Sequence, residues 1–140
     1  MEKRSDFDVD LAFGQAFEAR FADVFSEGTK VEVKTERNHW FRTGNIAIEI
    51  QSRGKPSGLS VTKADYWVHI LADGERSYYT ALLFPVARLK ELVKIYRSTA
   101  RGMGDNNANI CVLIPLKEVF THASKRAEKS ARRRKSAGSI

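Results

Sequence analysis

The chain has 140 residues, a length that fits one domain with one hydrophobic core. Its hydrophobic content of 42% and aromatic content of 10% are those of a globular protein and exclude wholesale disorder. The sequence has no apolar run long enough to cross a membrane and no charged-then-apolar leader, so we expect a cytoplasmic protein that does not engage a membrane.

The single cysteine and the uneven distribution of charge indicate which kinds of site and partner to expect. Cys111 lies within an apolar run, where an inert buried thiol is expected, and no Cys/His zinc spacing is present. Net charge is +7, of which residues 117–140 carry +6. The remainder is nearly neutral, so we expect residues 117–140 to bind a polyanion, through the tract Arg132, Arg133, Arg134 and Lys135.

The first expected element is an amphipathic helix over residues 8–25. Apolar residues recur there at three- and four-residue spacing, including Phe13, Phe17 and Phe21. Glu18 lies on this helix, either directed along the seam toward the following strands or paired on the helix surface.

Residues 31–36 and 45–51 alternate apolar and polar side chains, which predicts two half-buried strands. If they fold into one hairpin, Glu32 lies beside Glu49 on the polar face, with Lys34 and Gln51 one step along. Adjacent carboxylates repel, and a bound Mg²⁺ or Mn²⁺ would offset that repulsion. The alternative is an ordinary solvated hairpin face. Under both interpretations the core side is Val31, Val33, Ile46, Ile48 and Ile50.

Two connections carry candidate nucleic-acid contacts. Trp40 and Arg42 lie between the two strands and offer an aromatic and basic surface for bases, although Trp40 could instead close over the core. Arg53 and Lys55 lie in a glycine-rich loop after the second strand, suited to a DNA backbone. The loop lacks the ending of a nucleotide-binding phosphate loop, which excludes ATP or GTP hydrolysis.

The rest of the chain alternates short elements. We expect strands at 66–71, 78–84 and 110–116, a short helical turn at 60–65, a helix at 86–101, a loop at 102–107 and a basic helix from Lys117. Asp65, where the first of these strands begins, is either a further metal ligand or a cap. His69 is expected to be a core or edge histidine rather than a ligand.

Several of these segments together resemble small phage-type proteins of the PD-(D/E)XK nuclease superfamily, which includes Holliday junction resolvases and many restriction enzymes. The resemblance spans about residues 10–72 and is carried by 31–34, 43–46, 53–59 and 64–67. It implies a restriction-endonuclease-like α/β sandwich over residues 1–116, with a mixed central sheet flanked by helices. Residues 117–140 would follow as a basic helix and tail.

The resemblance also implies site residues. A helical glutamate such as Glu18 often joins the metal site in this superfamily, whose usual pattern is an acidic residue on one strand and Glu-x-Lys on its partner. Glu32-Val33-Lys34 is that motif if Glu49 replaces the aspartate. Otherwise, Glu32 stands for the aspartate and Glu49-Ile50-Gln51 is the motif, with glutamine in place of lysine.

The implied function is a Mg²⁺- or Mn²⁺-dependent DNA nuclease of a phage or its bacterial host, cutting duplex or branched DNA with a metal-activated water. Resolvase-like enzymes act as dimers on two strands, so a homodimer would favour the cutting of junctions. Whether it acts on DNA or RNA, and as an endonuclease or exonuclease, stays open. The alternatives are a non-catalytic nucleic-acid-binding accessory protein that uses the basic tail, and a scaffold that binds a host factor.

Overall fold

The computed structural model describes residues 6–37, 39–74, 77–121, 132–133 and 136–137. Within residues 6–115, the α-helices are α1 (Asp6–Ala22), α2 (His39–Thr43) and α3 (Val86–Ile95), and the 3-10 turns are η1 (Asp23–Phe25), η2 (Gly58–Ser60), η3 (Arg97–Thr99) and η4 (Asp105–Asn107). Residues 116–121 are helical as well, at the start of the basic helix expected from Lys117. The strands are β1 (Val31–Glu36), β2 (Asn45–Ser52), β3 (Lys55–Pro56), β4 (Tyr66–Ala72), β5 (Tyr78–Pro85), β6 (Arg101–Met103) and β7 (Asn109–Pro115).

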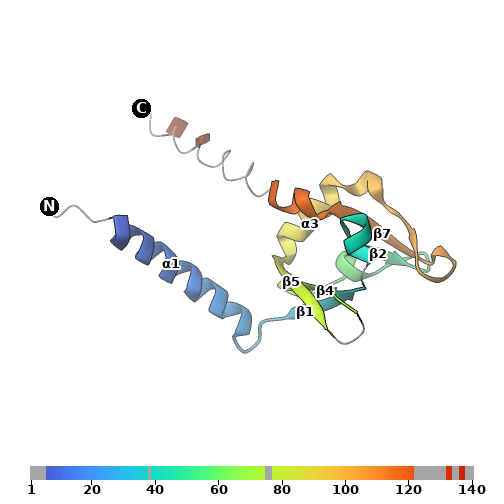
Figure 1. The fold of residues 1–140 in the computed structure, drawn as a ribbon, viewed down its shortest axis with the longest axis horizontal. Helices are drawn as coiled ribbons and strands as arrows, with labels where there is room; N and C mark the ends of the chain where they lie inside the picture. Colours follow the sequence, from blue (N-terminus) through green and yellow to red (C-terminus); the bar gives the residue numbers. More distant parts are fainter. Residues whose placement is uncertain (1–5, 38, 75–76, 122–131, 134–135, 138–140) are drawn as a thin grey trace.

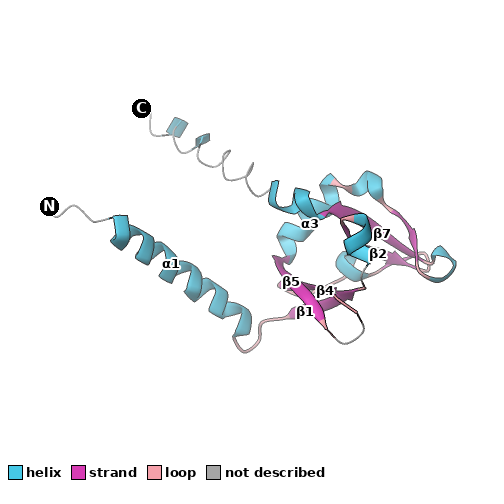
Figure 2. Ribbon diagram, in the orientation of Figure 1, coloured by secondary structure: helices cyan, strands magenta, loops and turns pink. Residues whose placement is uncertain are grey.

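The strands form two sheets (Figure 2). In sheet A, β4 is central, parallel to β1 and antiparallel to β5. Sheet B is antiparallel, in the order β3-β2-β7-β6. The expected α/β class with a mixed sheet is therefore found, but a second, antiparallel sheet stands beside the mixed one.

The prediction that residues 31–36 and 45–51 form a hairpin is wrong. Both strands form, as β1 and β2, but they belong to different sheets, so Glu32 lies opposite Trp67 and Glu49 lies opposite Cys111. The connection between the strands contains the helix α2, which cannot act as the tight turn that a hairpin needs. The chain passes instead from one sheet to the other.

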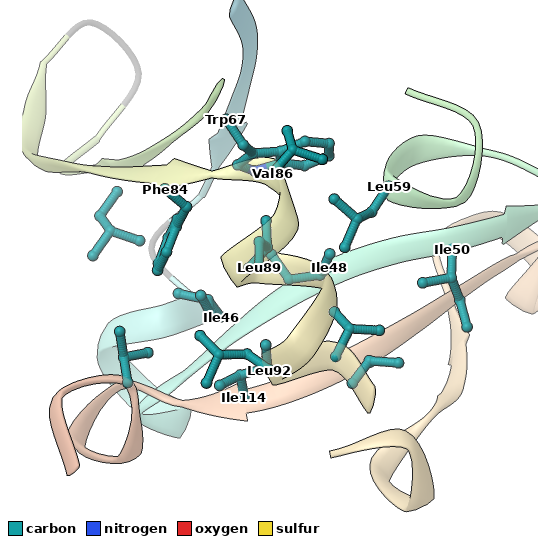
Figure 3. Packing of buried hydrophobic residues seen from close by; sticks show 14 residues of the cluster. Ile46, Ile48, Ile50, Leu59, Trp67, Phe84, Val86, Leu89, Leu92 and Ile114 are labelled. Carbon is teal, nitrogen blue, oxygen red and sulfur yellow. The ribbon is translucent and has the colours of Figure 1, made fainter. Parts of the chain in front are cut away.

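The core lies where α3 meets both sheets. Figure 3 shows Val86, Leu89 and Leu92 of α3 among side chains of β2, β4, β5 and β7. The prediction that Ile46, Ile48 and Ile50 face the core is confirmed, since each is at most 6% exposed. The same prediction was wrong for Val31 and Val33, which are 38% and 54% exposed on the outer side of sheet A.

The helix expected over residues 86–101 ends early, at Ile95. Thr99 explains the change: its Oγ1 donates to the carbonyl oxygen of Leu113 (2.8 Å) and accepts from the Leu113 amide (2.9 Å). These two hydrogen bonds hold Thr99 against β7. The residues that follow form β6, which pairs with β7 at the edge of sheet B. The loop expected at 102–107 is consequently part strand and part 3-10 turn.

α1 forms where the spacing of apolar residues predicts it, but its apolar side chains are not buried. Figure 1 shows the helix extending away from the sheets. Phe13, Phe17 and Phe21 are each more than half exposed, and the buried residue of this region is Val24 in η1. Within the ranges that the structure describes, no helix combines the length and the apolar character needed to span a membrane.

The segment after β2 is fitted tightly to that strand. The Ser57 amide donates to the Ile50 carbonyl oxygen (3.1 Å), and Leu59, 2% exposed, enters the core. Gly58 has φ of +53°, and a Cβ there would collide with the backbone carbonyl of Glu49. Glycine at this position thus allows both the left-handed conformation and the close approach.

We expect Gly58→Ala to lower the free energy of unfolding by roughly 2–4 kcal/mol, because it combines left-handed strain with a steric clash. Gly54→Ala is the matched control: Gly54 has φ of +78° with open space around it. Strain alone should cost it about 1–2 kcal/mol. Urea denaturation checks both, and equal losses would show that the contact with Glu49 is unimportant.

Candidate active site

The polar side of β1 lies on the same face of sheet A as buried side chains of β4. Glu32, Lys34 and Glu36 alternate along the strand, and their register partners on β4 are Trp67, His69 and Leu71, which are all buried. The predicted polar face of β1 therefore exists, with Glu32 and Glu36 partly buried and the side chain of Lys34 47% exposed to solvent.

Glu32 is held by two donors. Its Oε1 lies 3.0 Å from Lys34 Nζ, and its Oε2 accepts a hydrogen bond from Thr62 Oγ1 (2.8 Å). The hydrogen bonds from Lys34 and then Thr62 lower the pKa of Glu32 below its ordinary 4.5, against the opposing effect of burial. Glu32 is thus an ionised oxygen donor at neutral pH.

Glu49 is positioned from β2. Its Oε1 accepts a hydrogen bond from Ser57 Oγ (2.7 Å), and the residue is partly buried. The β2–β7 register shifts between Glu49 and Gln51, which marks an irregularity in β2. Such bulges re-aim side chains and are frequent beside active sites. Gln51 lies just past the irregularity and is also partly buried.

One short segment connects the two predicted glutamates. Ser57 binds Glu49, Thr62 binds Glu32, and the segment between them is closed by a hydrogen bond from the Thr62 amide to the Gly58 carbonyl oxygen (3.1 Å). Each of the two carboxylates therefore accepts a hydrogen bond from the same segment, residues 57–62, although Glu32 and Glu49 are not cross-strand neighbours.

Glu36 and His69 form a buried link that the sequence analysis did not assign. His69 is 2% exposed, and its Nε2 lies 2.6 Å from Glu36 Oε2. Trp67 Nε1 donates to His69 Nδ1 (3.3 Å), and an indole N–H can only donate, so Nε2 carries the proton given to Glu36. Glu36 Oε2 also accepts from the Ala47 amide (3.0 Å), which joins sheet A to β2. The same alternation that singled out Glu32 and Lys34 could have found Glu36.

Cys111 is buried, as expected. Burial, followed by the negative charges of Glu49 and Glu36, raises the pKa of its thiol to about 11. The thiol is therefore neutral at physiological pH and unsuited to act as a nucleophile. The joint influence of Glu49 and Glu36 also shows that both carboxylates lie near the same stretch of β7.

Two predicted metal ligands are not part of this group. Glu18 is exposed on α1. Asp65 Oδ2 accepts a hydrogen bond from the Lys30 amide (3.1 Å), just before β1, so its carboxylate fixes the start of that strand instead of capping the helical turn. Among the residues described by the structure, no three His, Cys, Asp or Glu side chains are arranged to hold one ion.

Trp40 and Arg42, the predicted contacts for bases, line a hollow of about 420 Å³ that contains neither Glu32 nor Glu49. The other residues that line it are Phe41, Asp73 and Tyr79. The Trp40 and Tyr79 rings lie 5.6 Å apart. Trp40 is partly buried and packs against the core, while its Nε1 donates to the Ala72 carbonyl oxygen (2.9 Å). Phe41 and Tyr79 are 78% and 71% exposed and thus accessible to a planar ligand.

The predicted basic contacts are on the surface. Both Arg53, in the turn after β2, and Lys55, the first residue of β3, are exposed. Arg132 and Arg133 are helical and exposed, whereas Arg134 and Lys135 lie outside the described residues.

Comparison of the chain with protein-family models, with curated proteins and with solved structures finds no match. The resemblance to PD-(D/E)XK nucleases therefore stays a prediction. The arrangement of side chains in this site is the basis on which a function can be proposed.

We expect Glu36→Ala to lower the free energy of unfolding by roughly 2–4 kcal/mol, because it leaves His69 and the Ala47 amide without their acceptor. Glu91→Ala is the control: Glu91 pairs with Arg88 (2.9 Å) but its side chain is 50% exposed. That substitution should cost less than about 1 kcal/mol. Urea denaturation measures both, and similar losses would contradict a linking role for Glu36.

The Glu32 carboxyl should titrate below 4.5 in an NMR pH titration. Because its pKa is lowered by folding, its contribution to stability is present above the unfolded pKa and is lost as pH falls through the folded value. Lys34→Met should raise the pKa of Glu32 more than Thr62→Val, since the Lys34 hydrogen bond is the largest cause. The reverse order would contradict the assigned contacts.

Proposed function

We propose that the chain is a divalent-metal-dependent DNA nuclease with its site at the junction of the two sheets. The supporting observation is the grouping of an ionised Glu32, Lys34 at 3.0 Å from it, and Glu49 held by the same segment that holds Glu32. Carboxylates that hold a metal ion, with a lysine beside one of them, are one set of groups that supports metal-dependent hydrolysis of a phosphodiester.

The donor set fits Mg²⁺ or Mn²⁺. Such ions take oxygen ligands and are commonly held by only one or two protein carboxylates, with water and phosphate completing the shell. Glu32 and Glu49 would hold the ion, each carboxylate being positioned by a hydroxyl of the Ser57–Thr62 segment. When bound, the ion supplies an activated water and polarises the phosphate.

Lys34 would position the attacking water and stabilise negative charge on the phosphate, since its ammonium group already lies against Glu32. This contact favours Glu32-Val33-Lys34 as the Glu-x-Lys motif, with Glu49 in place of the partner aspartate. Gln51, on the same strand as Glu49, would support the phosphate as a neutral donor.

Affinity for DNA would come from other parts of the surface. Arg53 and Lys55 are exposed at the turn that precedes the Ser57–Thr62 segment. The tail that begins at Lys117 adds a charge of +6. The hollow around Trp40, Phe41 and Tyr79 offers aromatic faces to an unpaired base.

We expect Glu32→Ala, Lys34→Ala and Glu49→Ala each to reduce cleavage at least about 100-fold, with DNA affinity changed less than about tenfold. Ser57→Ala should reduce cleavage roughly 10–100-fold, because Ser57 acts by orienting Glu49. Glu91→Ala should be unaffected. The assay uses labelled linear, single-stranded and four-way junction DNA with Mg²⁺, Mn²⁺ or EDTA.

A binding function without catalysis is the competing proposal, favoured by the occupied oxygens of Glu32, each of which already has a partner. It predicts binding that is independent of metal, falls steeply with salt and leaves every substrate intact. Binding without cleavage in all metal conditions would select it over the nuclease.

A further inference from the structure

The N-terminal helix presents a large apolar surface. Phe13, Phe17, Phe21 and Phe25 recur every four residues along α1 and η1, and ring centroids lie 4.7 Å apart for Phe13–Phe17 and 5.5 Å apart for Phe21–Phe25. Together with Phe7 these phenylalanines are 51–77% exposed. Taking about 200 Å² for each side chain, they expose roughly 600 Å² per chain. Soluble monomers rarely leave patches of this size uncovered.

The outer face of sheet A is a second apolar surface. Its three rows follow the strand register, and their central row consists of Val33, Val68 and Leu83. Val33 is 54% exposed and Leu83 36%. The inner face of this sheet packs on the core with α3, so the outer face is the free side of the sheet. The flanking rows are Val31, Tyr66 and Pro85, and Thr35, Ile70 and Ala81.

We propose that α1 of one chain packs on the outer face of sheet A of a second copy, and that the second copy does the same in return. One two-fold arrangement then covers both apolar surfaces of both chains. The phenylalanines alone would contribute about 1,200 Å² in the dimer, the lower bound of a specific interface, before the sheet residues are counted.

The linker between η1 and β1, residues 26–30, favours packing of α1 on the sheet of a second copy and not on the sheet of its own chain. Residues 26–30 are fixed by hydrogen bonds: Ser26 N to Asp23 O (3.1 Å), Thr29 Oγ1 to Asp23 O (2.8 Å) and Lys30 N to Asp65 Oδ2 (3.1 Å). With these bonds in place, α1 extends away from the sheets, as Figure 1 shows, and its apolar side chains are left uncovered by its own chain.

The charge of α1 favours a second copy of the chain, and not an anionic membrane, as its partner. α1 carries four carboxylates and one arginine, a net charge of −3, so the rest of the chain carries +10. An acidic helix is repelled by anionic lipid, whereas membrane-surface helices are rich in Lys and Arg. A second copy, in contrast, offers an apolar face on a chain whose charge outside α1 is positive, with +6 of that +10 in residues 117–140.

The test is analytical ultracentrifugation of the full chain and three variants. Phe17→Glu changes the helix surface and Val33→Glu changes the sheet surface. Ile95→Glu is the control, at a 52% exposed position on α3 outside both surfaces. Circular dichroism checks folding, which should persist because Phe17 and Val33 are exposed within one chain. If either variant melts early, Phe21→Glu replaces Phe17→Glu on the helix, and Thr35→Glu replaces Val33→Glu on the sheet.

We expect a wild-type dimer, an unaffected control, and a dissociation constant raised roughly thirtyfold or more by Phe17→Glu and by Val33→Glu. An equimolar mixture of these two variants should regain part of the association, since one helix–sheet contact is intact in the mixed dimer. A monomeric wild-type chain would overturn the proposal, with or without binding to anionic vesicles. So would a dimer weakened by Phe17→Glu alone, which would show helix-to-helix pairing. None of these readouts depends on nuclease activity.

Discussion

A buried polar contact at Glu36 joins the two sheets beside their shared core. Among the described strands, none of sheet A pairs with one of sheet B, so the backbone ladders do not set their mutual position. The hydrophobic core with α3 lies between the sheets, and the Glu36 carboxylate contacts both His69 on β4 and the Ala47 amide on β2. Removing one side of such a buried contact is costly, because the remaining donors are left without their acceptor.

The same side of β1 also carries the candidate site. Glu32 and Lys34 lie on the side of the strand that bears Glu36, next to buried side chains of β4. The Ser57–Thr62 segment then spans from β2 to β1 and fixes the two remaining carboxylates. Chemistry at the junction would thus use groups whose positions are set by both sheets at once, without a shared hairpin.

The sequence predicted the strands better than their pairing. Alternation is a local property, so β1, β2 and β4 could be located to within a residue or two. The partner of a strand is a non-local choice, and the inference failed there because a short helix in the 37–44 connection was taken for a turn. The faces of Val31 and Val33 were misassigned for a related reason: a valine stripe shows that a strand is two-sided but not which side the core takes. The alternation singled out Glu32 and Glu49 as polar side chains of their strands but not their partial burial, and their supporting hydroxyls, Ser57 and Thr62, carry no pattern that a single sequence reveals.

The state of Cys111 has a practical consequence for work on this chain. Its thiol is the only one in the sequence, is 8% exposed and has a pKa of about 11. Maleimide and iodoacetamide react with thiolates, so near pH 7 they should not label Cys111. A cysteine introduced at any exposed position becomes a unique attachment point for a fluorophore or spin label, without first removing the native one. Distances between labelled copies, and between a label and bound DNA, are then measurable on a chain whose interior is unaltered.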